Sequence, residues 1–421
     1  MIFVSGNRLL GSKIWIVTLI ISIFFTPVFG QTAWYDEWVG AQSKDAPNLL
    51  DDDFVVEKFV TGLSLPTTMT FVDNGILVLQ KNDGKVRYVM VNGTLLPNEV
   101  LDVEVSNLYE SGLLGIVYKN PFVYLYYTES IQDGEKPIAN NVYKYKWINN
   151  TLQDPILVKS LPAYHEALIH NGGAMVVGKD DTVYAVIGDQ NMVRGAGILQ
   201  NQFAQPDDTG VILPVDPPGP YFAIGIRNSF GLAIDPLTGN MWSTENGPSS
   251  FDEVNLVMPE FNSGWNAHTG PIKESRIHVV SVPDFFGVFK SQIQIFLSSI
   301  FSLFALSEYY EYSDPEFSWE KPHAPTAINF APSSFEKYGS WLFVGDCNFG
   351  NIYKFKLNSE RNGFVFEDYS LNDLVLNEND DADEILFGKG FGCITDIEFK
   401  GNEMYVVSLV DGTIYKISTS I

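Results

Sequence analysis

Residues 226–257 read IRNSFGLAIDPLTGNMWSTENGPSSFDEVNLV, and this stretch decides the fold of the chain. Two apolar segments flank a turn rich in Pro, Thr and Gly, which is typical of paired strands. The Gly247-Pro248 step then interrupts strand pairing, because proline has no N–H to donate. An acidic pair, Asp252-Glu253, follows. The stretch therefore predicts short strands joined by turns that gather polar groups.

The Asn-Gly-Pro turn within this stretch is also a candidate cation site. Gly247 and Pro248 can direct adjacent backbone carbonyls the same way. Carbonyl and carboxylate oxygens are the ligands that Ca²⁺ prefers, and Asp252 and Glu253 lie close by in sequence. The alternative is a surface turn between two strands, with a solvated acidic face.

The strand-turn-strand unit recurs six times along the chain, at residues 68–91, 115–146, 174–213, 231–258, 326–357 and 395–418. Short strands with glycine and aromatic punctuation, and no helical periodicity, favour a propeller over a sandwich. We therefore predict an all-β, six-bladed β-propeller over residues 52–421. FVVEKFV at 54–60 is expected to close the ring against the last blade. The functional site is expected where loops converge at the mouth of the central channel.

The N-terminus has the pattern of a secretory signal. Arg8 and Lys13 precede the apolar run IWIVTLIISIFF at 14–25, and small residues lead to a polar junction after Gly30. We predict a signal peptide over 1–30 and a linker over 31–51. The alternative is an uncleaved anchor formed by residues 14–29. Both alternatives put the domain outside the cytoplasm.

Charge and hydropathy limit the partners of this domain. The net charge of −25 argues against nucleic-acid binding. Residues 274–319 interrupt the pattern between the fourth and fifth units and contain the apolar segment FFGVFKSQIQIFLSSIFSLFALSEYY at 285–310. A membrane span here would put the two halves of one ring on opposite faces of the bilayer, so we expect a packed cap or a contact surface, membrane contact included.

A second segment, HNGGAMVVGKDDTVYAVIGDQ at 170–190, also indicates the function. Together with residues 226–257 it resembles the glucose/sorbosone dehydrogenase family, the soluble quinoprotein sugar dehydrogenases that use pyrroloquinoline quinone (PQQ) and calcium. Weaker similarities are SGLLGIVYKNPFVYLYYTES at 111–130 and GILVLQKNDGKV at 75–86. The resemblance runs from about residue 60 to the C-terminus, outside the 274–319 insertion.

The resemblance implies a role for each matching residue. His170 corresponds to the general base that takes the proton of the sugar hydroxyl, and a neutral imidazole suits that work. Arg227 and Asn228 correspond to residues on the cofactor, and Gln190 is placed with them at the channel mouth. Gly247 and Pro248 correspond to carbonyl donors for the catalytic calcium. Asp252 and Glu253 correspond to a second, structural calcium site.

The sequence departs from the family pattern where the cofactor carboxylates are held. The resemblance implies a lysine in the turn at LFVGDCNFGNIYKFKL, where this chain has Asn348, and two arginines at GFGCITDIEF, where it has Cys393 and Thr395. Lys389, in FGKGFG, is a candidate replacement for one of them. Cations that bind carboxylates strengthen binding by roughly 1.5–3 kcal/mol each, so their loss weakens the expected PQQ site.

Cys347 and Cys393 are the two cysteines, and both lie in these turn regions. Export permits a disulfide, and neighbouring blades bring such turns together. The alternative is two unrelated thiols. A bridge would occupy space that the resemblance assigns to the cofactor's carboxylates.

We predict an exported calcium- and PQQ-dependent oxidoreductase that acts on the CH–OH group of sugars or related alcohols and passes electrons to an external acceptor. Two alternatives stay open. One is a calcium-dependent lactonase or other hydrolase, in which the metal polarises a carbonyl and activates water. The other is a non-catalytic propeller that binds a ligand or partner, since a fold does not determine a function.

Overall fold

The computed structural model describes residues 46–166, 168–191, 207–265, 268–272 and 310–420. The described residues all belong to one compact unit. The expected signal at 1–30, the first part of the expected linker and nearly all of the apolar segment at 285–310 lie outside the described residues. No helix in the described part of the chain is long and apolar enough to cross a membrane.

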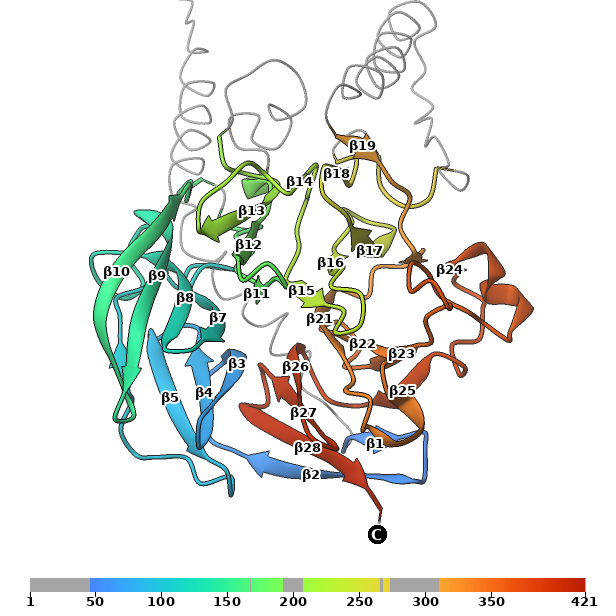
Figure 1. Cartoon of the computed structure of the whole chain (residues 1–421), viewed down its shortest axis with the longest axis horizontal. Coiled ribbons are helices and arrows are strands. Elements are labelled where there is room, and N and C mark those ends of the chain that lie inside the picture. The colour runs from blue at the N-terminus through green and yellow to red at the C-terminus, as the bar shows by residue number, and fades with distance from the viewer. Residues whose placement is uncertain (1–45, 167, 192–206, 266–267, 273–309, 421) are drawn as a thin grey trace, which may run out of the picture. The chain divides into compact units, whose positions relative to one another are not determined.

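The strands form six sheets arranged around a central channel (Figure 1). We call the sheets blades one to six, and give the strands of each from its innermost strand outward. Blade one contains β3 (Pro66–Val72), β4 (Gly75–Gln80), β5 (Lys85–Met90) and β6 (Leu101–Asp102). Blade two contains β7 (Leu113–Lys119), β8 (Phe122–Glu129), β9 (Ala139–Ile148) and β10 (Thr151–Leu161). Blade three contains β11 (Met175–Val177), β12 (Val183–Ile187), β13 (Val211–Asp216), β14 (Ala223–Ile224), β18 (Phe261–Asn262) and β19 (Glu311–Tyr312).

The remaining blades borrow strands from distant parts of the chain. Blade four contains β15 (Gly231–Ile234), β16 (Met241–Glu245), β17 (Asp252–Val257), β20 (Phe317–Trp319) and β24 (Val375–Leu376). Blade five contains β21 (Pro325–Phe330), β22 (Leu342–Asp346), β23 (Ile352–Phe355), β25 (Leu386–Lys389) and β1 (Asn48–Leu49). Blade six contains β26 (Ile394–Lys400), β27 (Glu403–Ser408), β28 (Thr413–Thr419) and β2 (Phe54–Val60). Two short 3-10 turns, η3 (Glu336–Tyr338) and η4 (Tyr369–Asp373), lie in the loops of blade five.

The six innermost strands close into a ring, which confirms the predicted six-bladed propeller. Each of β3, β7, β11, β15, β21 and β26 contacts the next, and β26 contacts β3. Each predicted repeat begins inside its innermost strand or one residue before it. All six strands line one cavity of about 330 Å³, which is the central channel.

The ring is closed by a strand from the start of the domain, as predicted. β2 pairs antiparallel with β28, with Phe54 opposite Thr419 and Val60 opposite Ile414. Two borders differ from the sequence-based expectation. Asn48–Leu49 falls in the expected linker but forms β1 on the edge of blade five, and residues 311–319 fall in the expected insertion but supply β19 and β20. A sheet edge with unpaired backbone groups favours this pairing, and the local sequence does not show it.

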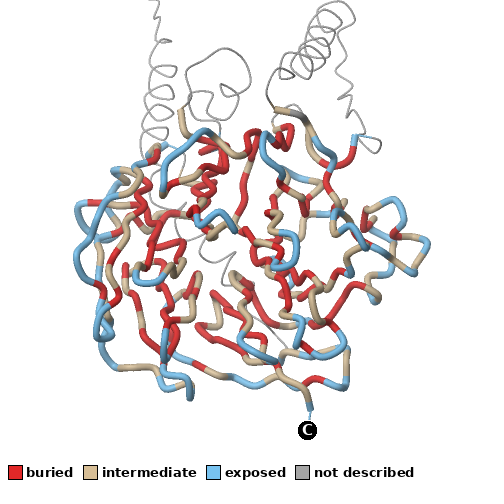
Figure 2. Tube along the Cα trace, viewed as in Figure 1, coloured by how far each residue is buried: buried red, intermediate tan, exposed pale blue. Residues whose placement is uncertain are grey.

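The core lies between the blades rather than within them. In β4 the alternate residues Ile76 and Val78 pack toward blade six, whereas Leu77 and Leu79 pack toward blade two. This two-residue period buries both faces of the strand, as Figure 2 shows for the inner strands. One cluster of buried side chains lies at each of the six blade interfaces in the described chain.

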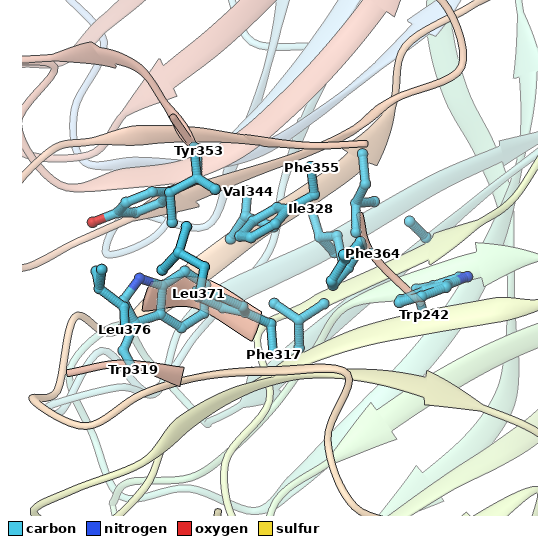
Figure 3. Close-up of a cluster of buried hydrophobic side chains, with 14 of the residues drawn as sticks. Trp242, Phe317, Trp319, Ile328, Val344, Tyr353, Phe355, Phe364, Leu371 and Leu376 are labelled. Atoms are coloured by element: carbon cyan, nitrogen blue, oxygen red, sulfur yellow. The ribbon is translucent and has the colours of Figure 1, made fainter. Parts of the chain in front are cut away.

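The interface between blades four and five contains the two fully buried tryptophans of the described chain. Trp242, Phe317 and Trp319 of blade four face Tyr353 and Phe355 of blade five (Figure 3). The rings of Phe317 and Phe355 lie 5.0 Å apart, and those of Trp319 and Tyr353 lie 5.2 Å apart. Such aromatic contacts add to the free energy of apolar burial and hold the loops above them in place.

Candidate active site at the channel mouth

The predicted site residues come together at one end of the channel because of strand direction. In an antiparallel sheet the loop before the first strand and the loop after the second strand lie at the same edge. This edge carries His170 before β11, Gln190 after β12, Arg227 before β15, Gly247 after β16, Asn348 after β22 and Cys393 before β26. We call this end of the channel the mouth.

His170 is held in a fixed orientation by a buried carboxylate. Its Nδ1 lies 2.5 Å from Oδ1 of Asp189, and both side chains are buried. The other oxygen of Asp189 accepts a hydrogen bond from Nε1 of Trp265 at 2.6 Å. A carboxylate in contact with both partners fixes the rotamer of each.

The backbone around His170 is supported by two further polar side chains. Its N–H donates to Oε2 of Glu110 at 2.5 Å, and its carbonyl accepts from Nε2 of Gln190 at 3.0 Å. Gln190 is fully buried and also donates to Oδ1 of Asn171. In this structure the Gln190 amide supports the His170 loop, and its expected place at the cofactor stays a prediction.

His170 and Arg227 belong to one site, as predicted from the sequence. Asp189 N–H donates to the carbonyl of Arg227 at 2.9 Å, which joins the loops of blades three and four. Gly188 lies between the two loops, and a Cβ there would be 2.6 Å from the His170 carbonyl and 2.7 Å from the Arg227 carbonyl. The approach of the two loops therefore requires glycine at this position.

The Arg227 guanidinium is fixed between the turn and an aromatic ring. Its Nη1 donates to the carbonyls of Asn246 at 2.7 Å and Gly247 at 3.1 Å, and its Cζ lies 5.3 Å from the Trp265 ring centroid. Burial lowers the pKa of Arg227, while the charges of nearby carboxylates such as Asp189 oppose the shift. Its Nε is buried and has no acceptor among the described residues.

The turn predicted to bind the catalytic calcium therefore faces a guanidinium in this structure. Gly247 directs its carbonyl toward Arg227, and Pro248 is exposed. Two buried amide oxygens nearby, Oδ1 of Asn228 and Oδ1 of Asn246, have no donor in the described part of the chain. The described residues contain no cluster of three or more His, Cys, Asp or Glu side chains placed to hold a metal ion. Calcium binding at this turn stays a prediction.

The two acidic residues after the turn, Asp252 and Glu253, lie in different environments. Asp252 accepts hydrogen bonds from the backbone N–H groups of Gly247, His323 and Ala324, at 2.8, 2.6 and 2.7 Å. Both carboxylate oxygens therefore bind the backbone in this structure, and the role of Asp252 as a metal ligand stays a prediction. Asp252 ties together the loops of blades four and five.

Glu253, by contrast, lies opposite another carboxylate. It pairs with Glu245 across β16 and β17, and both side chains are buried. Burial raises the pKa of both, and the charge of Glu245 raises that of Glu253 further. Glu253 accepts from Gly270 N–H at 2.6 Å, and Glu245 accepts from the Ser263 hydroxyl at 2.6 Å. A divalent cation between these carboxylates would relieve their repulsion.

The opposite side of the mouth is formed by blades five and six. Cys347 and Cys393 are joined by a disulfide between the two blades. Asn348 is exposed and donates to the carbonyl of Pro322, while Thr395 lines the channel and donates to the carbonyl of Pro66. Lys389, the candidate replacement cation, is exposed on β25, the fourth strand from the channel, and so does not line it.

The mouth fits one end of PQQ better than the other. The reacting end of the quinone would meet His170 and Arg227, whose buried Nε needs an acceptor. The carboxylate end would meet a disulfide and the half-buried Asp411, without the basic residues that the resemblance implies. Asp346 lies fully buried beneath, with both oxygens hydrogen-bonded. The chain therefore has the reacting residues that the resemblance implies and lacks the basic residues that it implies for the cofactor's carboxylates.

The sequence reasoning missed three residues of this site. Asp189 lies in the quoted Gly-Asp-Gln end of the second block, and Glu110 directly precedes the Ser-Gly-Leu-Leu-Gly segment, so both carried a local signal. Trp265 reaches Asp189 across 76 residues of sequence, so no local pattern points to it.

Comparison with known proteins supports the same family. The family model for glucose / sorbosone dehydrogenase matches residues 63–280, about half of the chain. The chain belongs to the glucose/sorbosone dehydrogenase family. Within this family it is 27% identical over 259 residues to quinoprotein glucose dehydrogenase B of Acinetobacter calcoaceticus, covering 51% of this chain and 52% of that protein. It is 23% identical over 331 residues to aldose sugar dehydrogenase YliI of Escherichia coli, covering 73% of this chain and 81% of that protein.

Solved structures of such dehydrogenases share the fold. The PQQ-bound aldose sugar dehydrogenase of Streptomyces coelicolor superimposes with a TM-score of 0.60 at 19% identity, covering 89% of this chain and all of that one. The apo-form of the soluble aldose sugar dehydrogenase of Escherichia coli gives a TM-score of 0.64 at 20% identity, covering 87% of this chain and 100% of that one. The chain spans about half the length of the first curated relatives it matches, 52% and 57%.

Proposed function

We propose that this protein is a PQQ-dependent sugar dehydrogenase, which oxidises the CH–OH group of an aldose to the lactone. The observation that carries the proposal is the buried His170–Asp189 pair at the channel mouth, beside Arg227. Membership of the glucose/sorbosone dehydrogenase family supports the same reaction class.

The geometry of the pair supports His170 as the proton acceptor. A carboxylate can only accept a hydrogen bond, so contact with Asp189 places the imidazole proton on Nδ1. Nε2 then carries the lone pair, which takes the proton of the sugar's anomeric hydroxyl. PQQ, when bound, would supply the quinone that accepts the hydride from the sugar carbon bearing this hydroxyl. Trp265 holds the second oxygen of Asp189, so the carboxylate keeps its orientation as His170 becomes charged.

Arg227 provides a fixed positive charge at this site. Carbonyls of the Asn-Gly-Pro turn and the Trp265 ring hold its guanidinium, so it needs no reorganisation when negative charge develops nearby. Partial burial strengthens its field relative to an exposed arginine.

Calcium, export and an external electron acceptor belong to the proposal as well. The orphaned amide oxygens of Asn228 and Asn246 and the Glu245–Glu253 pair support calcium binding. Export is supported by the signal pattern over residues 1–30.

Reconstitution with PQQ and Ca²⁺ tests the proposal. We expect an added aldose to reduce a redox dye, and His170→Gln to lower kcat/KM by about 10²-fold or more. His165→Gln is the matched control, because His165 also contacts a carboxylate, that of Glu166, but lies half exposed on the surface. Dye reduction that survives His170→Gln would remove the assigned base, and no turnover with any aldose would reject the reaction.

A further inference from the structure

On the side formed by blades five and six, the loops of the mouth carry no positive side chain that could bind a ligand with three negative charges. The loops 346–351, 390–394 and 409–412 form this side and contain no lysine or arginine. They contain two aspartates, Asp346 and Asp411. Lys321, in the neighbouring loop, is exposed, and its ammonium lies 5.7 Å from the Phe349 ring centroid. A ligand with three carboxylates would therefore meet a single cation, Lys321, at the edge of this side, and otherwise neutral groups and the half-buried Asp411.

These loops are also fixed in place. The disulfide joins Cys347 to the buried Cys393, and Asp346 accepts hydrogen bonds from the N–H groups of Phe349 and Gly350 at 2.7 and 2.8 Å. The two loops touch at Gly350, where a Cβ would lie 2.6 Å from the backbone nitrogen of Gly392. A covalent bond and close backbone packing therefore hold the two loops together.

The cations on the other side of the mouth are already held by protein oxygens, except for the Nε of Arg227. Arg227 donates to two backbone carbonyls. Lys81 is buried and donates to the Tyr109 carbonyl at 2.7 Å and to Oδ1 of Asn82 at 3.1 Å. Burial lowers the pKa of Lys81 to about 8, against the charge of Glu110, so the ammonium stays mostly protonated at neutral pH, and two oxygens of the protein occupy it.

We propose that PQQ is an exchangeable ligand of this protein rather than a resident cofactor, because a disulfide and loops without lysine or arginine stand where the resemblance places the cations for its carboxylates. This inference rests on the proposed function. Asn348 then determines how tightly the quinone is retained, because it is the exposed neutral residue beside the disulfide. The quinone then binds and leaves between turnovers, as a substrate does.

Equilibrium dialysis and gel filtration of the full chain in Ca²⁺ test this inference. We expect the wild-type protein to lose PQQ during gel filtration and to bind the neutral trimethyl ester of PQQ at least as tightly as PQQ itself. Asn348→Lys should tighten PQQ binding by on the order of 10-fold, with no gain for the ester, because one charge-assisted bond is added. The gain should fall as salt is raised.

Asn362→Lys is the matched control, since it adds the same charge at an exposed turn of blade five away from the mouth. It should leave PQQ binding unchanged. Wild-type protein that keeps one equivalent of PQQ through gel filtration, or an ester that binds tenfold more weakly than PQQ, would overturn the inference. Turnover at saturating PQQ tests the proposed function separately: its absence rejects the reaction, and the retention measurement still decides this inference.

Discussion

At the scale of single residues, the site depends on Asp189 more than on any residue that the sequence blocks single out. Asp189 contacts both His170 and Trp265, so one carboxylate orients the base and a neighbouring ring. It is a positioning residue, because it acts through His170 rather than on the substrate.

Asp189→Asn should therefore lower kcat strongly and change KM little. The amide can donate to Nδ1, which favours the wrong tautomer and leaves Nε2 protonated, and related substitutions cost on the order of 10²–10⁴-fold in rate. Steady-state kinetics with PQQ and an aldose measure this. Asp180→Asn, in an exposed turn of blade three, is the control and should leave kcat unchanged. An equal loss in both variants would contradict the positioning role.

At the scale of elements, β26 carries two acidic side chains toward the channel. Asp396 and Glu398 alternate along the strand and line the central cavity. Met69 N–H donates to Asp396 at 2.7 Å, and Asn329 donates to Glu398 at 3.1 Å. Burial raises the pKa of Asp396 to about 7, and burial together with the charge of Asp396 raises that of Glu398.

These raised values predict a pH dependence of stability. The folded protein favours the neutral carboxyls, so this stabilisation is complete below the unfolded pKa of about 4 and is lost as pH rises toward 7. Glu398→Gln should therefore raise Tm more at pH 8 than at pH 5, by on the order of 2 °C. Thermal unfolding at both values measures the difference, with the exposed Asp52→Asn as control. A shift that is equal at pH 5 and pH 8 would show that the pair does not titrate in this range.

At the scale of the whole molecule, two kinds of bond hold the ring of blades together. β2 pairs with β28 through backbone hydrogen bonds, and the Cys347–Cys393 disulfide joins blades five and six at the mouth.

Replacing both cysteines by serine should lower the free energy of unfolding by about 2–4 kcal/mol, since the bridge closes a loop of 46 residues. Denaturant unfolding measures the loss, and thiol titration of unfolded, unreduced protein checks the bridge itself. Two titratable thiols in the wild-type protein would show that the bridge is absent.

Calcium should raise Tm by mass action if only the folded propeller binds it. Glu253→Gln should remove most of that rise, because Glu253 faces Glu245. Asp252→Asn should lower Tm with and without calcium and keep the rise, because Asp252 binds three backbone N–H groups. An unfolding curve that excess chelator leaves unchanged would remove calcium from the proposal.

The sequence by itself determined the number of blades, the closing strand and the position of His170, Arg227 and the Asn-Gly-Pro turn at one mouth. These features follow from local patterns: alternating strands, turn residues and antiparallel direction set which loops share an edge. The family resemblance rested on the same local blocks, and the match over residues 63–280 confirms it.

Only the tertiary structure decided which way each polar side chain points and what it meets. Gln190 turns inward to brace a loop, Asp252 binds backbone N–H groups, and Arg227 takes the carbonyl predicted for calcium. Trp265 and the disulfide reach the mouth across long separations in sequence. A carboxylate or guanidinium is satisfied by whichever partner the packed blades bring within hydrogen-bond distance, and that choice depends on contacts that no local stretch of sequence contains.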